Sequence, residues 1–284
     1  MNNSFVFFGS SPISVTVLET LKAHNFKPTL IVTKPDSPQG RGLVVTASPV
    51  KVWADQEQIK VLTPEKIKTE EFQNALKEVS APFAILVSYG KIIPQTILDL
   101  FPKGIINVHP SLLPLLRGPA PIEYTILNDL KNHTGVSIML LDSKMDEGPI
   151  LAQKRVEIPD WPPTKSTLYE TLSKEGGILL SEILPDFLDE KLVSMPQDHT
   201  HATYCNIIKK EDGEISLLDN PYKNFLKIQA FEGWPGTYFF VQKNEKSIRV
   251  KISEASFENN ELILKKVIPE GKKEMNWDDF KRNL

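Results

Sequence analysis

Phe83-Ala-Ile-Leu-Val-Ser88 is apolar over almost its whole length. An unbroken apolar run of this kind is typical of a β-strand that is covered by helices on both of its faces. Gly104-Ile-Ile-Asn-Val108 is a second run of the same type, and Phe5-Val-Phe-Phe8 is a third, followed by a turn and a helical pattern. Buried strands that alternate with helices predict an α/β fold built on a doubly wound, mostly parallel sheet.

The pattern changes after a long helix predicted for Ser166 to Leu188, in which Gly176-Gly177 is the weak point. From Thr203 onward, short alternating segments such as Gly236-Thr-Tyr-Phe-Phe-Val241 are typical of antiparallel strands separated by turns. A chain of 284 residues also exceeds the size at which a single hydrophobic core usually stops growing. We therefore predict a first domain at residues 1–190, a linker at 191–202 and a small C-terminal β-barrel domain, OB-like in type, at 203–284.

The composition excludes a disordered chain and a strongly basic one. Apolar residues make up 40% of the chain and the formal net charge is −3, so a nucleic-acid partner would have to bind a local patch. The single cysteine, Cys205, cannot form an internal disulfide, which fits a reducing compartment. No basic, apolar leader is present at the N-terminus, and no apolar run is long enough for a membrane helix. We expect a cytoplasmic protein that does not bind membranes.

Polar side chains follow the buried strand at Gly104–Val108. Asn107 and His109 are two residues apart, so on an extended strand end both side chains point the same way. Ligands of open α/β sheets bind at strand ends, where an amide beside an imidazole could stabilise an oxyanion while the imidazole also handles a proton. The alternative is that His109 is a structural histidine and Asn107 a turn former.

Asp146 is the third candidate for the chemistry. It lies in Lys144-Met-Asp-Glu-Gly-Pro149, a loop between two strand-like runs. A carboxylate there could orient His109, raise its basicity or hold a water molecule. By itself an aspartate before Glu-Gly-Pro is usually a turn residue, so the case for a catalytic role of Asp146 rests on its combination with Asn107 and His109.

The order and spacing of these motifs match one known family. The matching segments are Asn107-Val-His109, Ser111-Leu-Leu-Pro114, Arg117-Gly118, Ala120-Pro121, Thr134-Gly135-Val136 and Met145-Asp146-Glu-Gly148. In them the chain resembles the formyltransferases that use 10-formyltetrahydrofolate, and among these the methionyl-tRNA formyltransferases. The resemblance implies that Asn107, His109 and Asp146 are catalytic. It also implies formyl transfer to the α-amine of methionyl initiator tRNA in translation initiation, without a metal.

Two segments match the part of this family that binds the folate. Ser88-Tyr-Gly-Lys-Ile-Ile-Pro94 resembles the loop on the folate side, which implies cofactor contacts for Tyr89 and Gly90. The resemblance likewise implies that Ser111, Leu112, Leu113 and Pro114 shape the folate site through backbone groups. The alternative for these four residues is a rigid turn that caps the next helix, and both interpretations can hold together.

The resemblance to the tRNA-specific branch covers other segments. Lys34-Pro-Asp-Ser-Pro-Gln-Gly-Arg-Gly42 resembles a loop that this branch inserts, which implies a tRNA contact for Arg41, with a solvated loop residue as the alternative. Related chains usually continue this loop with lysines, whereas Leu43-Val44 follow here. Lys272 and Lys273 have counterparts in the family and are further candidate tRNA contacts, with a solvated charge pair as the alternative. Phe231-Glu-Gly-Trp-Pro235 resembles the opening of the C-terminal domain, and we expect Trp234 in a core rather than as a platform on which a base stacks.

Other functions remain open from the sequence alone. A sibling enzyme could formylate a nucleotide-linked amino sugar or another amine with the same three catalytic residues. A second alternative hydrolyses formyl-folate without an acceptor, and a third is a non-catalytic module that binds RNA or folate. The inserted loop and the C-terminal β domain favour tRNA, and we expect a monomer. For Arg117, binding of a carboxylate or phosphate and a solvated or core-bridging role are equally compatible with the sequence.

Overall fold

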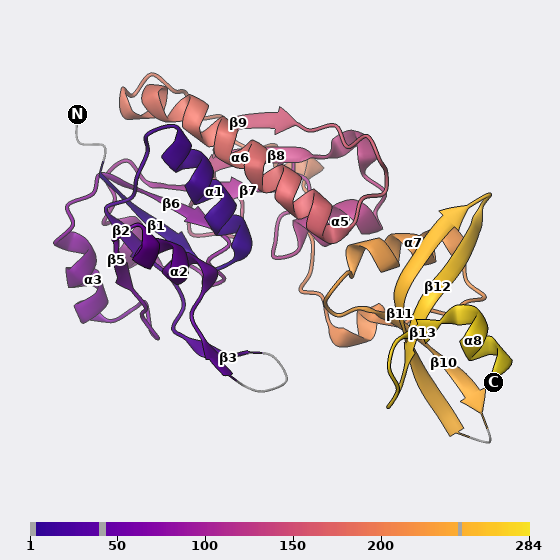
Figure 1. Cartoon of the computed structure of the whole chain (residues 1–284). Coiled ribbons are helices and arrows are strands. Elements are labelled where there is room, and N and C mark those ends of the chain that lie inside the picture. The colour runs from indigo at the N-terminus through magenta and orange to yellow at the C-terminus, as the bar shows by residue number, and fades with distance from the viewer. Residues whose placement is uncertain (1–3, 40–43, 244–245) are drawn as a thin grey trace. The chain divides into compact units, whose positions relative to one another are not determined.

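The computed structural model describes residues 4–39, 44–243 and 246–284 (Figure 1). The chain packs into two compact units. The first comprises Met1–Arg117, Gly135–Val156 and Tyr169–Tyr204, and the second Gly118–Thr134, Glu157–Leu168 and Cys205–Leu284. Because these units are defined by packing alone, the assignment of roles to domains at 1–190 and 203–284 stays a prediction.

The first unit is built on a seven-stranded sheet. Its strands are β1 (Phe5–Gly9), β2 (Leu30–Val32), β5 (Lys60–Leu62), β6 (Phe83–Val87), β7 (Ile105–His109), β8 (Gly135–Leu140) and β9 (Ile150–Arg155). They lie in the order β5-β2-β1-β6-β7-β8-β9. Neighbours are parallel from β5 to β7, and β8 is antiparallel to both of its neighbours. The predicted mostly parallel sheet is confirmed.

Helices cover both faces of this sheet. They are α1 (Pro12–Ala23), α2 (Pro49–Gln56), α3 (Glu70–Lys77), α4 (Gln95–Leu98) and α6 (Lys165–Leu188). Phe72 of α3 and Ile97 of α4 pack in one cluster with Phe8 of β1. On the other face α6 runs beside α1 (Figure 1), and its Phe187 ring lies 5.7 Å from that of Phe83. Covering on both faces is the reason why the strands read as unbroken apolar runs.

Gly176 and Gly177 allow α6 to approach the sheet and α1 closely. A Cβ atom at Gly176 would lie 2.6 Å from a methyl group of Val108 in β7, and one at Gly177 would lie 2.8 Å from the Cβ of Thr20 in α1. Both distances are shorter than real contacts, so a larger residue would force the helix outward. The two glycines that weaken this helix in isolation therefore fit it to its neighbours, and α6 continues through them.

The segment after β2 contains a short hairpin that the sequence patterns did not reveal. Its strands β3 (Ser37–Gln39) and β4 (Val44–Thr46) are antiparallel. Both Val44 and Val45 are 67% exposed, so this hairpin has no buried face and leaves no hydrophobic periodicity to detect. The candidate tRNA contact Arg41 lies between the two strands, outside the described residues.

The second unit contains a four-stranded antiparallel sheet in the order β10-β11-β12-β13. The strands are β10 (Thr237–Lys243), β11 (Lys246–Glu258), β12 (Glu261–Pro269) and β13 (Met275–Asn276), and the unit's α-helices are α5 (Pro121–Leu127), α7 (Pro221–Ala230) and α8 (Trp277–Arg282). Phe239, Val250 and Phe280 pack in its core. The expected small antiparallel unit is confirmed, but Trp234 is 57% exposed, so its predicted place in a core is wrong.

The short single turns of 3₁₀-helix are Lys131–His133, His199–His201 and Lys210–Gly213. Across the described ranges of the chain, no helix is both long and apolar enough to cross a membrane.

Tyr89 lies in the core between the sheet and α3 and α4. The residue is fully buried, and its ring meets Phe8 edge-on with the ring centres 5.5 Å apart. Its hydroxyl group has no hydrogen-bond partner in the described part of the chain. Burial raises the pKa of Tyr89 to about 12. An enclosed hydroxyl without a partner costs free energy, since it has lost its hydrogen bonds to water.

We predict that Tyr89→Phe raises the free energy of unfolding by about 1 kcal/mol, because it removes this unpaired hydroxyl and keeps the ring. Since the pKa of Tyr89 is higher in the folded chain than in the unfolded one, the native chain retains this proton more strongly. The free energy of unfolding of the wild type therefore falls as the pH rises from about 10, where the unfolded chain loses this proton, toward 12. The advantage of the variant grows over this range. Urea titrations of the wild type, Tyr89→Phe and the partly exposed control Tyr124→Phe measure both effects. If Tyr89→Phe lowered the free energy of unfolding and Tyr124→Phe did not, the assignment of an unpaired hydroxyl at Tyr89 would be contradicted.

Candidate active site

The strand order places a cavity at the point where the sheet reverses its direction of growth. The chain passes from β1 to β2 and β5 on one side, and β6 and β7 lie on the other. At such a point the loops after the central strands diverge and leave a crevice. A cavity of about 320 Å³ lies here. Its lining residues are Ser10, Ser11, Lys34, Pro35, Ser37, Thr46, Ser48, Pro49, Ser88 and Gly90. The described residues of its walls carry hydroxyl groups and an ammonium group, which suit a polar or anionic part of a ligand.

Asn107 and His109 occupy the carboxyl end of β7, two strands from β1. They are 6% and 4% exposed, and the pleat of the strand directs both side chains to the same face of the sheet. In the described part of the chain the Asn107 side chain makes no hydrogen bond, although buried amides normally do. Its donor and acceptor atoms are therefore available to a bound molecule.

The ring of His109 is held by one hydrogen bond. Nε2 of His109 lies 3.0 Å from the carbonyl oxygen of Leu116. A carbonyl oxygen can only accept a hydrogen bond, so Nε2 carries a proton. In the neutral ring the other nitrogen, Nδ1, is consequently the basic one. This contact fixes both the orientation of the ring and the atom that can take up a proton.

Asp146 lies opposite that basic nitrogen. Its Oδ1 is 3.8 Å from Nδ1 of His109, and its side chain is 14% exposed. This distance is too long for a direct hydrogen bond but short enough for an ion pair when the imidazole is protonated. With a neutral imidazole, two proton acceptors face each other across this gap. A group that carries N–H or O–H bonds, such as an amine or a water molecule, can donate to either of them.

The turn after His109 is tied to β8 and β9. The backbone N–H of Leu113 donates to Oγ of Ser137 at 2.9 Å, and Nε2 of Gln153 donates to the Leu113 carbonyl at 2.7 Å. Oγ of Ser137 also donates to the carbonyl of Ser111 at 2.6 Å. Ser111 and Leu113 are buried, whereas Leu112 and Pro114 are partly exposed. These bonds hold the turn in place, but it does not cap the next helix, because α5 begins at Pro121 after Ala120. Folate contacts from residues 111–114 stay a prediction.

The other candidate residues lie in different surroundings. Gly90 lines the cavity, whereas the neighbouring Tyr89 points into the core and not into the cavity. Lys272 and Lys273 are exposed in the connection between β12 and β13. Arg117 is only 1% exposed, so it is a core-bridging arginine and does not meet an external anion in this structure. The roles of Tyr89, Gly90 and the two lysines in binding stay predictions.

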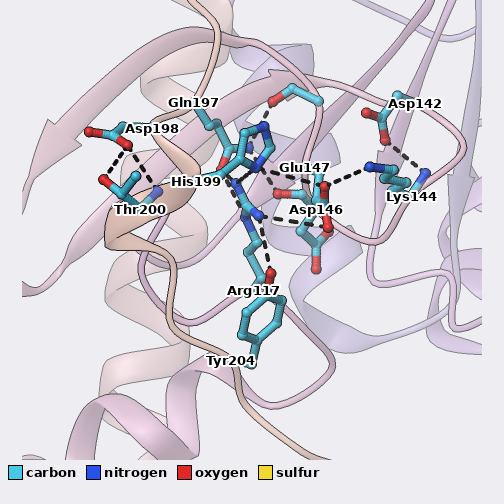
Figure 2. Close-up of polar contacts among 11 residues, drawn as sticks. Arg117, Asp142, Lys144, Asp146, Glu147, Gln197, Asp198, His199, Thr200 and Tyr204 are labelled. Carbon is cyan, nitrogen blue, oxygen red and sulfur yellow. Dashed lines mark hydrogen bonds and ion pairs between the residues drawn. The ribbon is translucent and has the colours of Figure 1, made fainter.

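Two groups that shape the site were not found from the sequence. One is the Leu116 carbonyl, which carries no side-chain signal. The other is Gln197, whose Nε2 donates to the carbonyls of Asp146 and Gly148 at 2.9 and 2.7 Å (Figure 2). Gln197 lies in the segment read as a linker, about fifty residues from this loop, and a lone glutamine in such a segment gives no indication of its partner.

A family model described as formyl transferase matches residues 2–184. A methionyl-tRNA formyltransferase from Dictyoglomus thermophilum is 37% identical over 305 residues, which cover 97% of this chain and 95% of the relative. One from Bacillus velezensis is 34% identical over 300 residues, which cover 98% of this chain and 93% of the relative. The similarity to both relatives thus extends through the second unit.

Solved structures share the fold at lower identity. A sugar N-formyltransferase from a Shewanella species has a TM-score of 0.65 at 18% identity, over 90% of this chain and 99% of that one. A methionyl-tRNA formyltransferase from Clostridium thermocellum has a TM-score of 0.62 at 18% identity, over 94% and 98%. An N-formyltransferase from Helicobacter canadensis, solved with folinic acid and dTDP-3-aminofucose, has a TM-score of 0.60 at 18% identity, over 91% and 89%.

The family match spans well over half of the chain, and the relatives align with nearly all of it. The buried amide, the imidazole and the carboxylate lie within the matched segment. The chain belongs to the formyl transferase family, whose members take the formyl group from a formyl-tetrahydrofolate.

Proposed function

We propose that this chain transfers a formyl group from 10-formyltetrahydrofolate to the α-amine of methionyl initiator tRNA in the cytoplasm. The observation that carries the proposal is the pair of proton acceptors formed by Nδ1 of His109 and the Asp146 carboxylate, beside the unpaired amide of Asn107. Acyl transfer to an amine needs a proton acceptor for the nucleophile and a donor for the oxyanion, and these groups supply both. The curated relatives named methionyl-tRNA formyltransferases support the choice of acceptor.

In the first step the aminoacyl ammonium group enters the gap between His109 and Asp146. The gap accepts N–H donors because Nε2 is committed to the Leu116 carbonyl and only the lone pair of Nδ1 faces Asp146. One proton passes to Nδ1, and the Asp146 carboxylate balances the charge of the resulting imidazolium. The free amine then attacks the formyl carbon, so a new C–N bond forms and the carbonyl electrons move to oxygen.

In the second step the oxyanion is stabilised and the folate leaves. The side-chain N–H of Asn107 and the Nδ1–H of protonated His109 donate to the oxyanion. When the carbonyl re-forms, the bond between the formyl carbon and N10 breaks. The attacking nitrogen still carries two protons after the attack, so it gives up a second proton as N10 takes one up, and the proton that passed to His109 is released to solvent. The products are formylmethionyl-tRNA and tetrahydrofolate. No step of this chemistry uses a metal, since the formyl donor is already activated.

We assign the rest of the substrates to the surroundings of this centre. The folate lies along the turn at residues 111–114 and the loop that contains Tyr89 and Gly90. The cavity with Lys34 and its ring of hydroxyl groups takes a polar part of the acceptor or of the folate. Arg41, Lys272 and Lys273 are the proposed contacts to tRNA phosphates, which such cations bind without reading sequence. Residues 1–190 form the catalytic domain in this proposal, and residues 203–284 help to hold the tRNA.

We predict that the purified chain formylates methionyl initiator tRNA with 10-formyltetrahydrofolate as donor. Free methionine, a dTDP-linked amino sugar and a reaction without acceptor provide the comparison, because solved structures of similar fold include sugar N-formyltransferases. The readout is the appearance of the formylated acceptor and of tetrahydrofolate. Turnover on the amino sugar but not on the charged tRNA would refute the proposed acceptor, and formate release without acceptor would identify a hydrolase.

We predict that Asn107→Asp lowers kcat by roughly 100- to 1,000-fold, which is the usual cost of losing one oxyanion donor. The aspartate has the same shape as the asparagine but places negative charge where the oxyanion develops. Single-turnover measurements under saturating substrates isolate this step from binding. The matched control is Asn74→Asp on the exposed side of α3. Equal rates for Asn107→Asp and the control would rule out the oxyanion role of Asn107.

A further inference from the structure

Arg117 is the largest of the side chains that are completely enclosed in the described part of the chain. Nε and Nη2 of its guanidinium group donate to Oε1 of Gln197, at 3.0 and 2.8 Å. Nη2 also lies 3.1 Å from Nδ1 of His199, and the Glu147 carboxylate is 3.8 Å from Nη1 (Figure 2). A guanidinium in such a place is not positioned to meet a substrate, so its function has to be sought in the groups that it holds.

The arginine determines which way the Gln197 amide faces. A guanidinium has only N–H donors, so the oxygen of the glutamine side chain must point toward Arg117. The amide nitrogen then points the other way, where it donates to the carbonyls of Asp146 and Gly148. Gln197 is 5% exposed, so no water competes easily for these bonds. Every polar atom of the Gln197 side chain is thus committed to one arrangement.

These two bonds hold a backbone conformation that is unfavourable by itself. Asp146 has a φ of 56°, in the left-handed region that residues with a side chain adopt less readily than glycine. The carbonyl of Asp146 and that of Gly148, two residues later, both accept from the same amide nitrogen. The loop therefore cannot relax to an ordinary conformation without breaking one of these bonds. Relaxation would swing the Asp146 carboxylate away from His109.

The same arginine is also connected to His109. The carbonyl that accepts from Nε2 of His109 belongs to Leu116, the residue before Arg117. The backbone N–H groups of Leu116 and Arg117 donate to the side chain and the carbonyl of Thr203, each at 2.9 Å. The segment 116–117 thus holds the imidazole through the Leu116 carbonyl. Through Arg117 and Gln197 it also holds the loop that carries the Asp146 carboxylate.

We propose that Arg117 and Gln197 are positioning residues, which set the separation of His109 and Asp146 by holding the Asp146 loop against the segment that fixes the His109 ring. This inference rests on the proposed function for its kinetic consequences. Neither residue touches substrate. They act by keeping Nδ1 and the carboxylate close enough for one amine beside them to contact both, and a displacement of about 1 Å there lowers turnover by up to about 100-fold.

The test is Gln197→Glu, compared with Gln73→Glu on the surface of α3 as the matched control. The glutamate keeps the length of the side chain and still accepts from Arg117. Its second carboxylate oxygen has no N–H to donate, however, so it would repel the carbonyl oxygens of Asp146 and Gly148. We expect kcat for methionyl-tRNA to fall roughly 10- to 100-fold, while KM for both substrates and the thermal midpoint change little. Arg117→Lys, which cannot hold Gln197 with two bonds, is the second variant and should show the same division between kcat and KM.

A double variant separates positioning from a general structural effect. If Gln197 acts through Asp146, then Gln197→Glu should cause almost no further loss of kcat in an Asp146→Ala background. A Gln197→Glu variant with the kcat of the wild type would overturn the inference. So would an equal fold-loss of kcat on introducing Gln197→Glu into the wild type and into Asp146→Ala. If the wild type does not formylate methionyl-tRNA, the proposed function fails. The positional claim is then decided by the crystal structure of Gln197→Glu, where an unmoved Asp146 would overturn it and a displaced one would support it.

Discussion

The hydrogen bond from Nε2 of His109 to the Leu116 carbonyl is the constraint on which the candidate site depends. It assigns the proton of the neutral imidazole to one nitrogen and leaves the other facing Asp146, 3.8 Å away. If the ring were turned over, an N–H would point at the carboxylate and the pair would satisfy itself without a substrate. The bond therefore leaves two proton acceptors beside each other, where an amine can donate a proton, and it does so through a backbone carbonyl.

The rest of the first unit keeps this bond in place. β7 is enclosed by parallel and antiparallel neighbours, and α6 approaches its Val108 through Gly176. The turn that follows is tied to Ser137 and Gln153 in β8 and β9, so the chain reaches Leu116 along a fixed path. The buried Arg117 then commits Gln197 to the Asp146 loop. Rigid supports of this kind hold the Asp146 loop and the strand-end imidazole opposite each other at 3.8 Å.

The sequence was sufficient for the sheet, because strands covered on both faces carry unbroken apolar runs. Asn107 and His109 could be proposed together because they share a strand end, whereas Asp146 was added to them through the order of the family's motifs. The hairpin of β3 and β4 could not be predicted because its valines are exposed, and Trp234 was misplaced because a large apolar side chain does not reveal where a turn will leave it. Gln197 and the Leu116 carbonyl were missed for another reason. Their roles arise only when distant segments meet, and a backbone carbonyl is common to all residues, so the residue type does not indicate its role.

The most direct test of the account is nitrogen NMR of the protein labelled with ¹⁵N-histidine, with His109 assigned by comparison with His109→Ala and observed at a pH where its ring is neutral. The account predicts the tautomer with the proton on Nε2 and an unprotonated Nδ1, and a change in the Nδ1 signal when a substrate amine is added. A neutral ring with its proton on Nδ1 would contradict the account, because the Leu116 contact and the proton-accepting gap would both be lost.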